Sequence, residues 1–180
     1  MDDVNWPSLL KECRTPGEDL FEVLAKANLD SSSLKKLAQP PQIGKPYGRI
    51  VLHESEAGEV LLVQWAPETF CALHDHGVGS GVICFFEGIC DEEYWDFDPE
   101  TGLKFKDRIT RNPGDSCRIE AGALHRVKAQ LDGALSLHFY VPSSGGMRVF
   151  EAEKNRYHIV TDDCGAWLPD PAQIKETISW

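Results

Sequence analysis

The chain of 180 residues has the length of one domain with a single hydrophobic core. Hydrophobic residues make up 42% of it and charged residues 26%, a balance that excludes an intrinsically disordered chain. The formal net charge of −11 argues against nucleic acid and anionic membranes as partners, because binding to either requires clustered Lys and Arg side chains.

No apolar run approaches the roughly 20 residues that a membrane-spanning helix needs. The first residues, MDDVNWPSLLKE, are acidic and lack the basic and then apolar stretches of a signal peptide. We therefore expect a cytoplasmic protein.

Residues 1–45 carry helical signals. Apolar residues follow helical spacing over residues 20–27, the serines at 31–33 can cap a further helix, and the prolines at 40–41 end it. These signals predict two or three short helices that pack against the main body as an N-terminal cap of a single domain.

Residues 46–160 change to short β-like runs separated by turn residues. Many short strands at this spacing are typical of an all-β sandwich or barrel. We expect residues 161–180 to form a C-terminal tail of the same domain. The predicted strands are 48–55, 59–67, 70–77, 80–88, 92–98, 103–110, 115–122, 124–130, 135–142, 147–153 and 155–160.

The six cysteines follow no regular spacing and include no CxxC pair. In a cytoplasmic chain this pattern predicts buried thiols rather than a disulfide framework or a zinc site. The cysteines lie at positions 13, 71, 84, 90, 117 and 164.

Three histidines form the first candidate site. On a strand, residues two apart point to the same face, so His74 and His76 can converge on one metal ion while Asp75 points away. An HxH pair alone is a weak signal, since it also occurs on solvated strands. His125, at the start of another predicted strand, strengthens it as a third ligand.

A second constellation lies on the predicted strand 135–142. The spacing of Ser136, His138 and Tyr140 places them on one face. A hydroxyl, an imidazole and a phenol in series can form a hydrogen-bonded relay, although a buried polar cluster with a purely structural role has the same pattern.

These features resemble the cupin superfamily, whose first motif contains HxH, then usually Glu, then Gly. His74, His76 and Gly88 keep the spacing, but Gly81 stands at the carboxylate position. The segment NPGDSCRIEAGALHRV resembles the second cupin motif and contributes His125. The resemblance implies a cupin (jelly-roll-like) β-barrel whose metal site has three histidines and no carboxylate.

A cupin site without the carboxylate resembles the thiol dioxygenases, and cysteine dioxygenase in particular. This resemblance extends from about Pro46 to Pro142, and four motifs occur in the family's order. The motifs are Tyr47-Gly48-Arg49, His74-Asp75-His76, Leu124-His125-Arg126-Val127 and Ser136-Leu137-His138-Phe139-Tyr140.

The resemblance implies a reaction and a metal. Cysteine dioxygenases use Fe(II) and dioxygen to oxidise free L-cysteine to cysteine sulfinic acid, a known step of thiol oxidation. Imidazole ligands alone suit Fe, Zn, Cu and Ni, so the choice of iron comes from the resemblance. We expect an iron-dependent dioxygenase in which His74, His76 and His125 hold Fe(II), with a small thiol and dioxygen as its partners.

The resemblance also implies roles for residues around the metal. Arg49 is the candidate for binding the substrate carboxylate, because a guanidinium can form two parallel hydrogen bonds with it. Tyr47 shares the strand face of Arg49 and could line the same pocket. Ser136, His138 and Tyr140 would act as the relay, with Tyr140 tuning the binding of substrate and dioxygen.

Gly81 marks a departure from the animal enzymes. Animal cysteine dioxygenases carry a cysteine five residues after the second histidine of HDH, and it crosslinks to the tyrosine that Tyr140 matches. Gly81 occupies that position here, so no thioether can form from it. The chain in this respect resembles the bacterial branch, in which glycine is usual.

Three alternatives remain open. One is a dioxygenase of another small thiol such as 3-mercaptopropionate, whose relatives generally have Gln at the position of Arg49; Arg148 could then bind the carboxylate. Another is a non-catalytic metal-binding cupin, and a third is a zinc or nickel cupin that acts as an isomerase or lyase. The oligomeric state is also open, with a monomer among the options.

Overall fold

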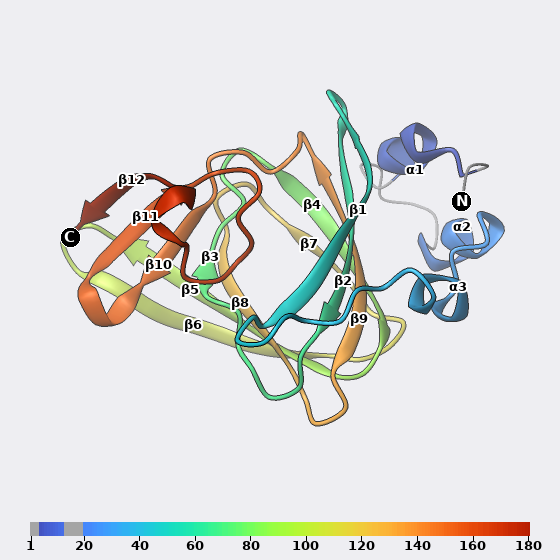
Figure 1. Ribbon diagram of the computed structural model, residues 1–180, viewed down its shortest axis with the longest axis horizontal. Coiled ribbons are helices and arrows are strands. Elements are labelled where there is room, and N and C mark those ends of the chain that lie inside the picture. The colour runs from blue at the N-terminus through green and yellow to red at the C-terminus, as the bar shows by residue number, and fades with distance from the viewer. Residues whose placement is uncertain (1–3, 13–19) are drawn as a thin grey trace.

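The computed structural model of the protein describes residues 4–12 and 20–180. Within these residues, three short helices precede a series of strands that begins with β1 (Tyr47–Ser55) (Figure 1). The helices are α1 (Trp6–Glu12), α2 (Leu20–Lys26) and α3 (Ser31–Lys35). The other strands are β2 (Gly58–Trp65), β3 (Leu73–His74), β4 (Ser80–Glu87), β5 (Cys90–Asp98), β6 (Gly102–Arg111), β7 (Ser116–Ile119), β8 (Leu124–Ala129), β9 (Ala134–Val141), β10 (Arg148–Glu151), β11 (Arg156–Val160) and β12 (Ile174–Ser179).

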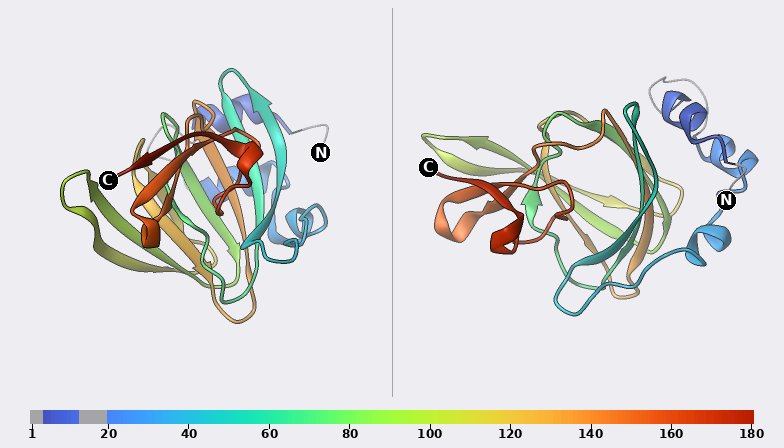
Figure 2. Two further views of the ribbon diagram at one scale, coloured as in Figure 1. Left: turned by 60° about the vertical axis from the view of Figure 1, so that its left-hand side comes forward. Right: turned by 45° about the horizontal axis from the view of Figure 1, so that its top comes forward.

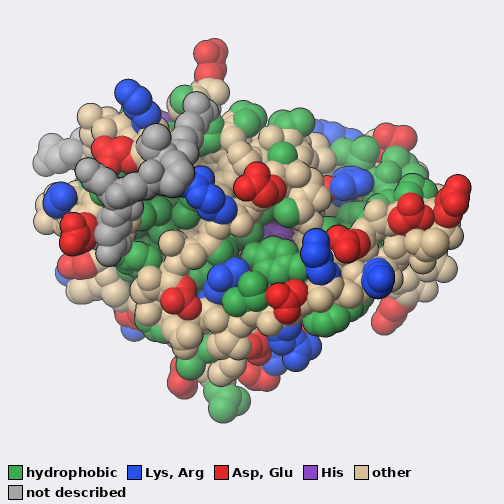
Figure 3. All heavy atoms as spheres, turned by 180° about the vertical axis from the view of Figure 1, so that it is seen from behind, with side chains coloured by type: hydrophobic (Ala, Val, Ile, Leu, Met, Phe, Trp, Pro, Cys, Tyr) green, Lys and Arg blue, Asp and Glu red, His purple; other side chains and the backbone are tan. Residues whose placement is uncertain are grey.

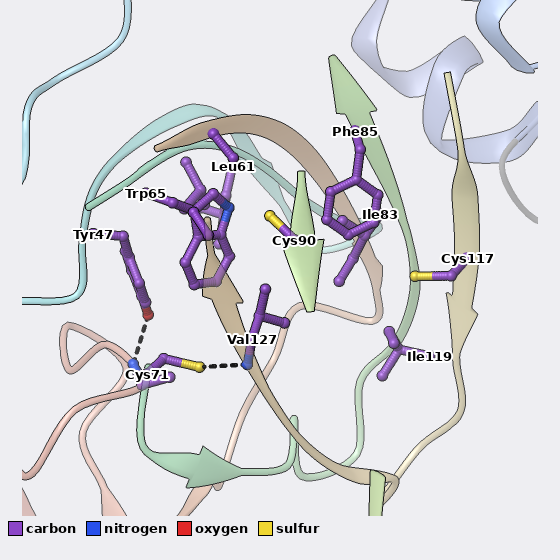
Figure 4. Close-up of a cluster of buried hydrophobic side chains, with 14 of the residues drawn as sticks. Tyr47, Leu61, Trp65, Cys71, Ile83, Phe85, Cys90, Cys117, Ile119 and Val127 are labelled. Carbon is purple, nitrogen blue, oxygen red and sulfur yellow. Dashed lines mark hydrogen bonds between the residues drawn. The ribbon is translucent and has the colours of Figure 1, made fainter. Parts of the chain in front are cut away.

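The strands form two antiparallel sheets that enclose a common interior (Figures 1 and 2). One sheet has the order β1-β2-β9-β4-β7 and the other the order β12-β11-β10-β3-β8-β5-β6. Leu61 and Ile83 from the first sheet share one buried cluster with Cys90 and Val127 from the second (Figure 4). The predicted fold class, all-β with a small helical N-terminal part, is confirmed.

Strand β9 shows how alternation of side chains builds both the core and the interior. Leu137 and Phe139 belong to the buried cluster beneath the helices. Their neighbours Ser136, His138 and Tyr140 are buried on the opposite side, toward the interior between the sheets. Because side chains alternate along a strand, a strand that is covered on both faces can be apolar on one and polar on the other.

The helices cover the outer face of the five-stranded sheet (Figure 1). Leu24 of α2 and Leu34 of α3 have no exposed area and share a cluster with Leu62 of β2. Burying a leucine side chain contributes about 1.5–3 kcal/mol. The prediction of two or three short helices is confirmed. Pro16 and Gly17, which precede α2 in the sequence and can mark its start, lie outside the described residues.

The start of α3 differs from the prediction that the serines at 31–33 supply the cap. Asp30 is the N-cap: its carboxylate accepts a hydrogen bond of 2.7 Å from the Ser33 amide. Ser33 Oγ in turn accepts a bond of 3.1 Å from the Asp30 amide, which completes a capping box. A charged carboxylate is a stronger acceptor for the amides of a first turn than a hydroxyl, which explains the shift by one residue.

The C-terminal segment is more ordered than a tail. A 3₁₀ turn over Pro171–Gln173 leads into β12, which pairs antiparallel with β11. The ring of Trp180 packs edge-on against Phe97 with the centroids 4.9 Å apart. The strand pairing and this contact attach the C-terminus to the outer end of the seven-stranded sheet (Figure 1).

The described cysteines are buried thiols, as their irregular spacing predicts. Cys71, Cys84, Cys90, Cys117 and Cys164 are buried, and no disulfide joins them; Cys13 lies outside the described residues. On the face shown in Figure 3, acidic and basic side chains are interspersed. None of the helices within residues 4–12 and 20–180 has the length and apolar character needed to cross a membrane.

Candidate metal centre

Three buried histidines lie together in the interior. Strands β3 and β8 pair antiparallel with His74 directly opposite His125. The ring of His76 lies 4.9 Å from that of His74 and 5.2 Å from that of His125, centroid to centroid. One ring nitrogen of each lies within 4.8 Å of the others, and the Nε2 atoms of His76 and His125 are 3.1 Å apart. The structure thus brings together the three histidines that the HxH and LHRV motifs contain.

The hydrogen bonds of His74 and His125 through Nδ1 show whether these rings can bind a metal ion through Nε2. His74 Nδ1 lies 2.9 Å from the Ala72 carbonyl oxygen, and His125 Nδ1 lies 2.8 Å from Glu92 Oε1. Both oxygens can only accept, so each Nδ1 carries the hydrogen and each Nε2 lone pair is available to a metal. Burial lowers the pKa of His74 and His76 well below the usual range, which keeps both neutral, the form that ligates metals. The site therefore fits a metal ion, whose identity imidazoles alone do not decide.

The histidines line a cavity that opens partly to solvent. Arg49 and Tyr47 of β1 line the same cavity. The Arg49 guanidinium donates from Nη2 to the carbonyl oxygen of Asp162 over 3.2 Å. The Tyr47 hydroxyl accepts a hydrogen bond of 2.6 Å from the Ala166 amide (Figure 4). Tyr47 thus holds the segment after β11 against the cavity, a contact that its motif does not reveal.

Ser136, His138 and Tyr140 form a continuous row of hydrogen bonds along β9. Ser136 Oγ lies 2.8 Å from His138 Nε2, and His138 Nδ1 lies 2.9 Å from the Tyr140 hydroxyl. That hydroxyl is 3.3 Å from Nε2 of His76, so the row ends at the histidine cluster. Burial lowers the pKa of His138 to about 3, which keeps its imidazole neutral. The geometry of a relay that ends beside the candidate metal is therefore present.

Comparisons with known proteins bear on the fold. No protein-family model matches the chain, and no curated protein matches it in sequence. An uncharacterised conserved protein with a double-stranded β-helix domain from Klebsiella pneumoniae is similar with a TM-score of 0.55 and 16% identity, over 66% of this chain and 88% of that one. TT1209 from Thermus thermophilus has a TM-score of 0.50 and 23% identity, over 61% of this chain and 94% of that one.

The double-stranded β-helix is the barrel of the cupins. This chain has the cupin fold. KdgF from Halomonas sp. is a further similar structure, with a TM-score of 0.48 and 13% identity over 59% of this chain and 90% of that one. At these identities the similarity extends to the fold alone, so the chemistry of this protein has to be argued from its own residues.

The carboxylate position of the usual cupin motif is closed to any side chain. Gly81 of β4 pairs with Tyr140 of β9. A β carbon at position 81 would lie 2.2 Å from the carbonyl oxygen of Phe139 and 2.6 Å from Cδ1 of Tyr140. Contacts that short do not occur, so neither a glutamate ligand nor a crosslinking cysteine fits here without movement of β9. The three histidines are left as the candidate metal ligands of the protein.

A fully buried carboxylate that sequence reasoning missed lies behind the centre. Glu92 of β5 accepts from His125 Nδ1 through Oε1 and from Arg111 Nε through Oε2, each over 2.8 Å. Burial acts to raise the pKa of Glu92, but the hydrogen bond from His125 and the charge of Arg111 outweigh it and lower the pKa to about 2. Arg111 also donates to the Tyr94 hydroxyl over 3.1 Å. The carboxylate thus contacts a candidate ligand, His125, from behind and does not itself belong to the candidate metal site.

Asp75 points away from the histidines, as predicted, and has a structural role. Its carboxylate accepts from the amides of Gly77 and Arg148 over 3.0 and 2.9 Å, and from Arg148 Nε over 2.6 Å. These bonds turn the chain, so the strand predicted over 70–77 is reduced to β3. They also hold the Arg148 guanidinium over the Phe150 ring, and Arg148 does not line the cavity. The alternative role of Arg148 as a carboxylate contact therefore has no support in the geometry.

Part of the cavity wall comes from a segment without any motif. Met147, Thr161, Asp162 and Cys164 line it, and they belong to the stretch between β9 and the C-terminus. No spacing or residue type in this stretch signals a site. His158, which lies in no recognisable motif, is outside the cavity and has its Nδ1 2.8 Å from the Thr177 hydroxyl, a structural contact.

Proposed function

We propose that this cupin is an Fe(II)-dependent dioxygenase that oxidises the thiol of free L-cysteine to cysteine sulfinic acid. One observation carries the proposal: a centre of three histidines without a carboxylate opens into the same cavity as Arg49 and the Tyr140 hydroxyl. His74, His76 and His125 would hold the iron. The substrates are a small thiol and dioxygen.

The charge of the site favours an anionic ligand. Three neutral imidazoles leave a divalent ion with its full charge, which a thiolate can balance in place of the missing carboxylate. Iron, when bound, would supply the point at which the thiolate meets dioxygen, so that both oxygen atoms end on sulfur. Part of the cavity wall is buried and apolar, including Leu61, Ile83 and Val127, and this low-dielectric surface strengthens the electrostatic contacts beside it.

Arg49 is suited to bind the carboxylate of the substrate. The residue is half-buried at the cavity, and one of its five N–H donors is occupied by the Asp162 carbonyl oxygen. A bidentate pair with a carboxylate fixes orientation as well as charge. A thiol held in this way at its acid end would present sulfur to the histidines.

Tyr140 is suited to position the substrate from the other side. Its hydroxyl is 3.3 Å from His76 Nε2 and fully buried, and burial raises its pKa well above the usual range, so it remains a neutral phenol. A neutral phenol can donate one hydrogen bond to a ligand in the cavity while its oxygen accepts from His138.

3-Mercaptopropionate is the nearest alternative substrate, because it carries a thiol and a carboxylate but no amine. Arg148 is held by Asp75 outside the cavity, which favours Arg49 as the carboxylate contact for either thiol. The two substrates then differ only in whether the amine contributes to binding.

Oxygen uptake by the Fe(II)-loaded protein tests the proposal. We expect uptake with L-cysteine to exceed that with 3-mercaptopropionate, and His125→Ala, which lacks a ligand, to lose both tight Fe(II) binding and uptake. His158→Ala, which changes a histidine outside the cavity, is the matched control and should retain both.

Each other outcome has a definite meaning. Oxygen uptake with 3-mercaptopropionate alone would support thiol oxidation but show that the substrate is 3-mercaptopropionate and not L-cysteine. Stoichiometric zinc in the purified protein, together with no uptake after iron is restored, would favour a zinc cupin. If the protein binds iron but consumes no oxygen with either thiol, the dioxygenase is rejected and a non-catalytic metal-binding cupin is favoured.

A further inference from the structure

The indole of Trp65 extends the row of hydrogen bonds that ends at Tyr140. Trp65 is the last residue of β2, and its buried side chain points into the interior (Figure 4). Its Nε1–H donates to Ser136 Oγ over 2.8 Å. The row therefore runs from Trp65 through Ser136 and His138 to Tyr140, and all four side chains are buried.

Trp65 sets the direction of the first bond. An indole nitrogen can donate but not accept, so Ser136 Oγ must accept from it. The single hydroxyl hydrogen of Ser136 then needs an acceptor of its own. Among the described residues, that acceptor is His138 Nε2, 2.8 Å away. Nε2 of His138 is thus the unprotonated nitrogen.

The direction of the Ser136–His138 hydrogen bond also determines the direction of the bond between His138 and Tyr140. A neutral imidazole has one donor and one acceptor nitrogen, so with Nε2 accepting, Nδ1 of His138 carries the hydrogen. Nδ1 donates to the Tyr140 oxygen over 2.9 Å. The hydrogen of Tyr140 is then directed away from His138 and into the metal cavity, beside His76, whose Nε2 lies 3.3 Å from the hydroxyl.

The reverse direction leaves a buried group unsatisfied. If His138 Nε2 carried the hydrogen, Ser136 Oγ would receive hydrogens from both Trp65 and His138. The hydroxyl hydrogen of Ser136, a residue with no exposed area, would then have no acceptor among the described residues. An unsatisfied buried donor disfavours that arrangement by roughly tenfold or more.

We propose that Trp65 is a positioning residue that directs the hydrogen bonds of Ser136 and His138, so that the Tyr140 hydroxyl donates toward the metal cavity. The direction follows from contacts between β2 and β9, and only its use in thiol oxidation rests on the proposed function. With the opposite direction, Tyr140 would donate to His138 and present only oxygen lone pairs to a ligand.

Nitrogen NMR of the full-length protein tests the direction. Long-range proton–nitrogen correlations of ¹⁵N-histidine distinguish the two neutral tautomers, and loading with Zn(II) keeps the sample diamagnetic. His138, assigned by the loss of its signals in His138→Gln, should carry its hydrogen on Nδ1. In Trp65→Phe, which keeps an aromatic ring but lacks the N–H, we expect the tautomer ratio to shift toward Nε2–H by about tenfold.

Two further variants keep the test decisive. Trp95→Phe is the matched control, because the buried indole N–H of Trp95 has no hydrogen-bond partner among the described residues, and the His138 tautomer should not change. Ser136→Ala interrupts the row without touching the indole and should shift the tautomer in the same sense as Trp65→Phe. It also replaces Trp65→Phe if that variant does not fold.

A hydrogen on Nε2 of His138 in the unaltered protein would overturn the inference. An unchanged tautomer in both folded variants, Trp65→Phe and Ser136→Ala, would do the same. Because Zn(II)-loaded protein is measured, the result does not depend on thiol oxidation. If His138 has the predicted tautomer but the Fe(II)-loaded protein oxidises no thiol, the inferred direction of the hydrogen bonds is supported and the proposed function is rejected.

Discussion

Glu92 Oε1 and His125 Nδ1 are joined by a hydrogen bond of 2.8 Å between two side chains that are almost completely buried. Arg111 holds the other oxygen of the carboxylate at 2.8 Å. A carboxylate that accepts from a ligating histidine fixes the ring orientation and makes the opposite nitrogen a stronger donor. Glu92 thus places a negative charge near the candidate metal site, which lacks the carboxylate that the usual cupin motif has at the position of Gly81.

Replacing Glu92 with Gln should weaken metal binding. Glutamine can still accept from His125 but carries no charge, so we expect the affinity for Fe(II) to fall by about 10–100-fold. Competition with a chelator measures the affinity. Glu93→Gln is the control, since Glu93 is an equally buried neighbour that pairs with Arg126 instead. Equal affinities in the two variants would remove Glu92 from the metal site.

Replacing Arg49 with Ala should affect only substrates that carry a carboxylate. A charge-assisted hydrogen bond contributes about 1.5–3 kcal/mol, so kcat/KM for L-cysteine should fall by about 10–100-fold. Cysteamine, a thiol without a carboxylate, provides the control in the same variant. An equal loss for both thiols would point to a structural role of Arg49.

Adding one methyl group at Gly81 should disturb Tyr140. The β carbon of Gly81→Ala would lie 2.6 Å from Cδ1 of Tyr140, so we expect the free energy of unfolding to fall by about 1–3 kcal/mol. Urea unfolding measures the change. At Gly145 the nearest atom to such a carbon is 3.9 Å away, so Gly145→Ala should be nearly neutral. Equal stability of both variants would contradict the close packing of β4 on β9.

The stability of the metal-free protein should depend on pH through His138. Burial lowers the pKa of His138 from 6.5 to about 3 in the folded state. As the pH falls below about 6.5, the unfolded chain binds a proton there that the folded chain excludes, so stability decreases with falling pH. His138→Gln should make this slope shallower by up to about 1.4 kcal/mol per pH unit between about pH 6 and 4. Parallel slopes in urea unfolding of the two proteins would show that His138 titrates normally.

The sequence was sufficient for the residues whose placement follows from strand alternation. His138 and Tyr140 lie two apart on β9, and the period of a strand puts both on one face whatever the rest of the fold. The fold class followed in the same way from short runs separated by turns, and the fold comparison confirms it.

Residues that depend on distant partners could not be predicted. Glu92 and Glu93 are adjacent in an acidic run, and no local signal tells which one faces inward. Glu92 does so because His125, 33 residues later in the chain, lies beside it on the neighbouring strand. Nothing in the sequence around Trp65 distinguishes it from an ordinary core residue, because its partner Ser136 lies on a strand that is far away in sequence.

Oxidation of L-cysteine by the Fe(II)-loaded protein under ¹⁸O-labelled dioxygen tests the central claim most directly. If the three-histidine centre brings thiolate and dioxygen together, mass spectrometry should find cysteine sulfinic acid with both sulfinate oxygens labelled. Cystine as the sole product, or a sulfinate whose oxygens come from water, would contradict a dioxygenase at this site.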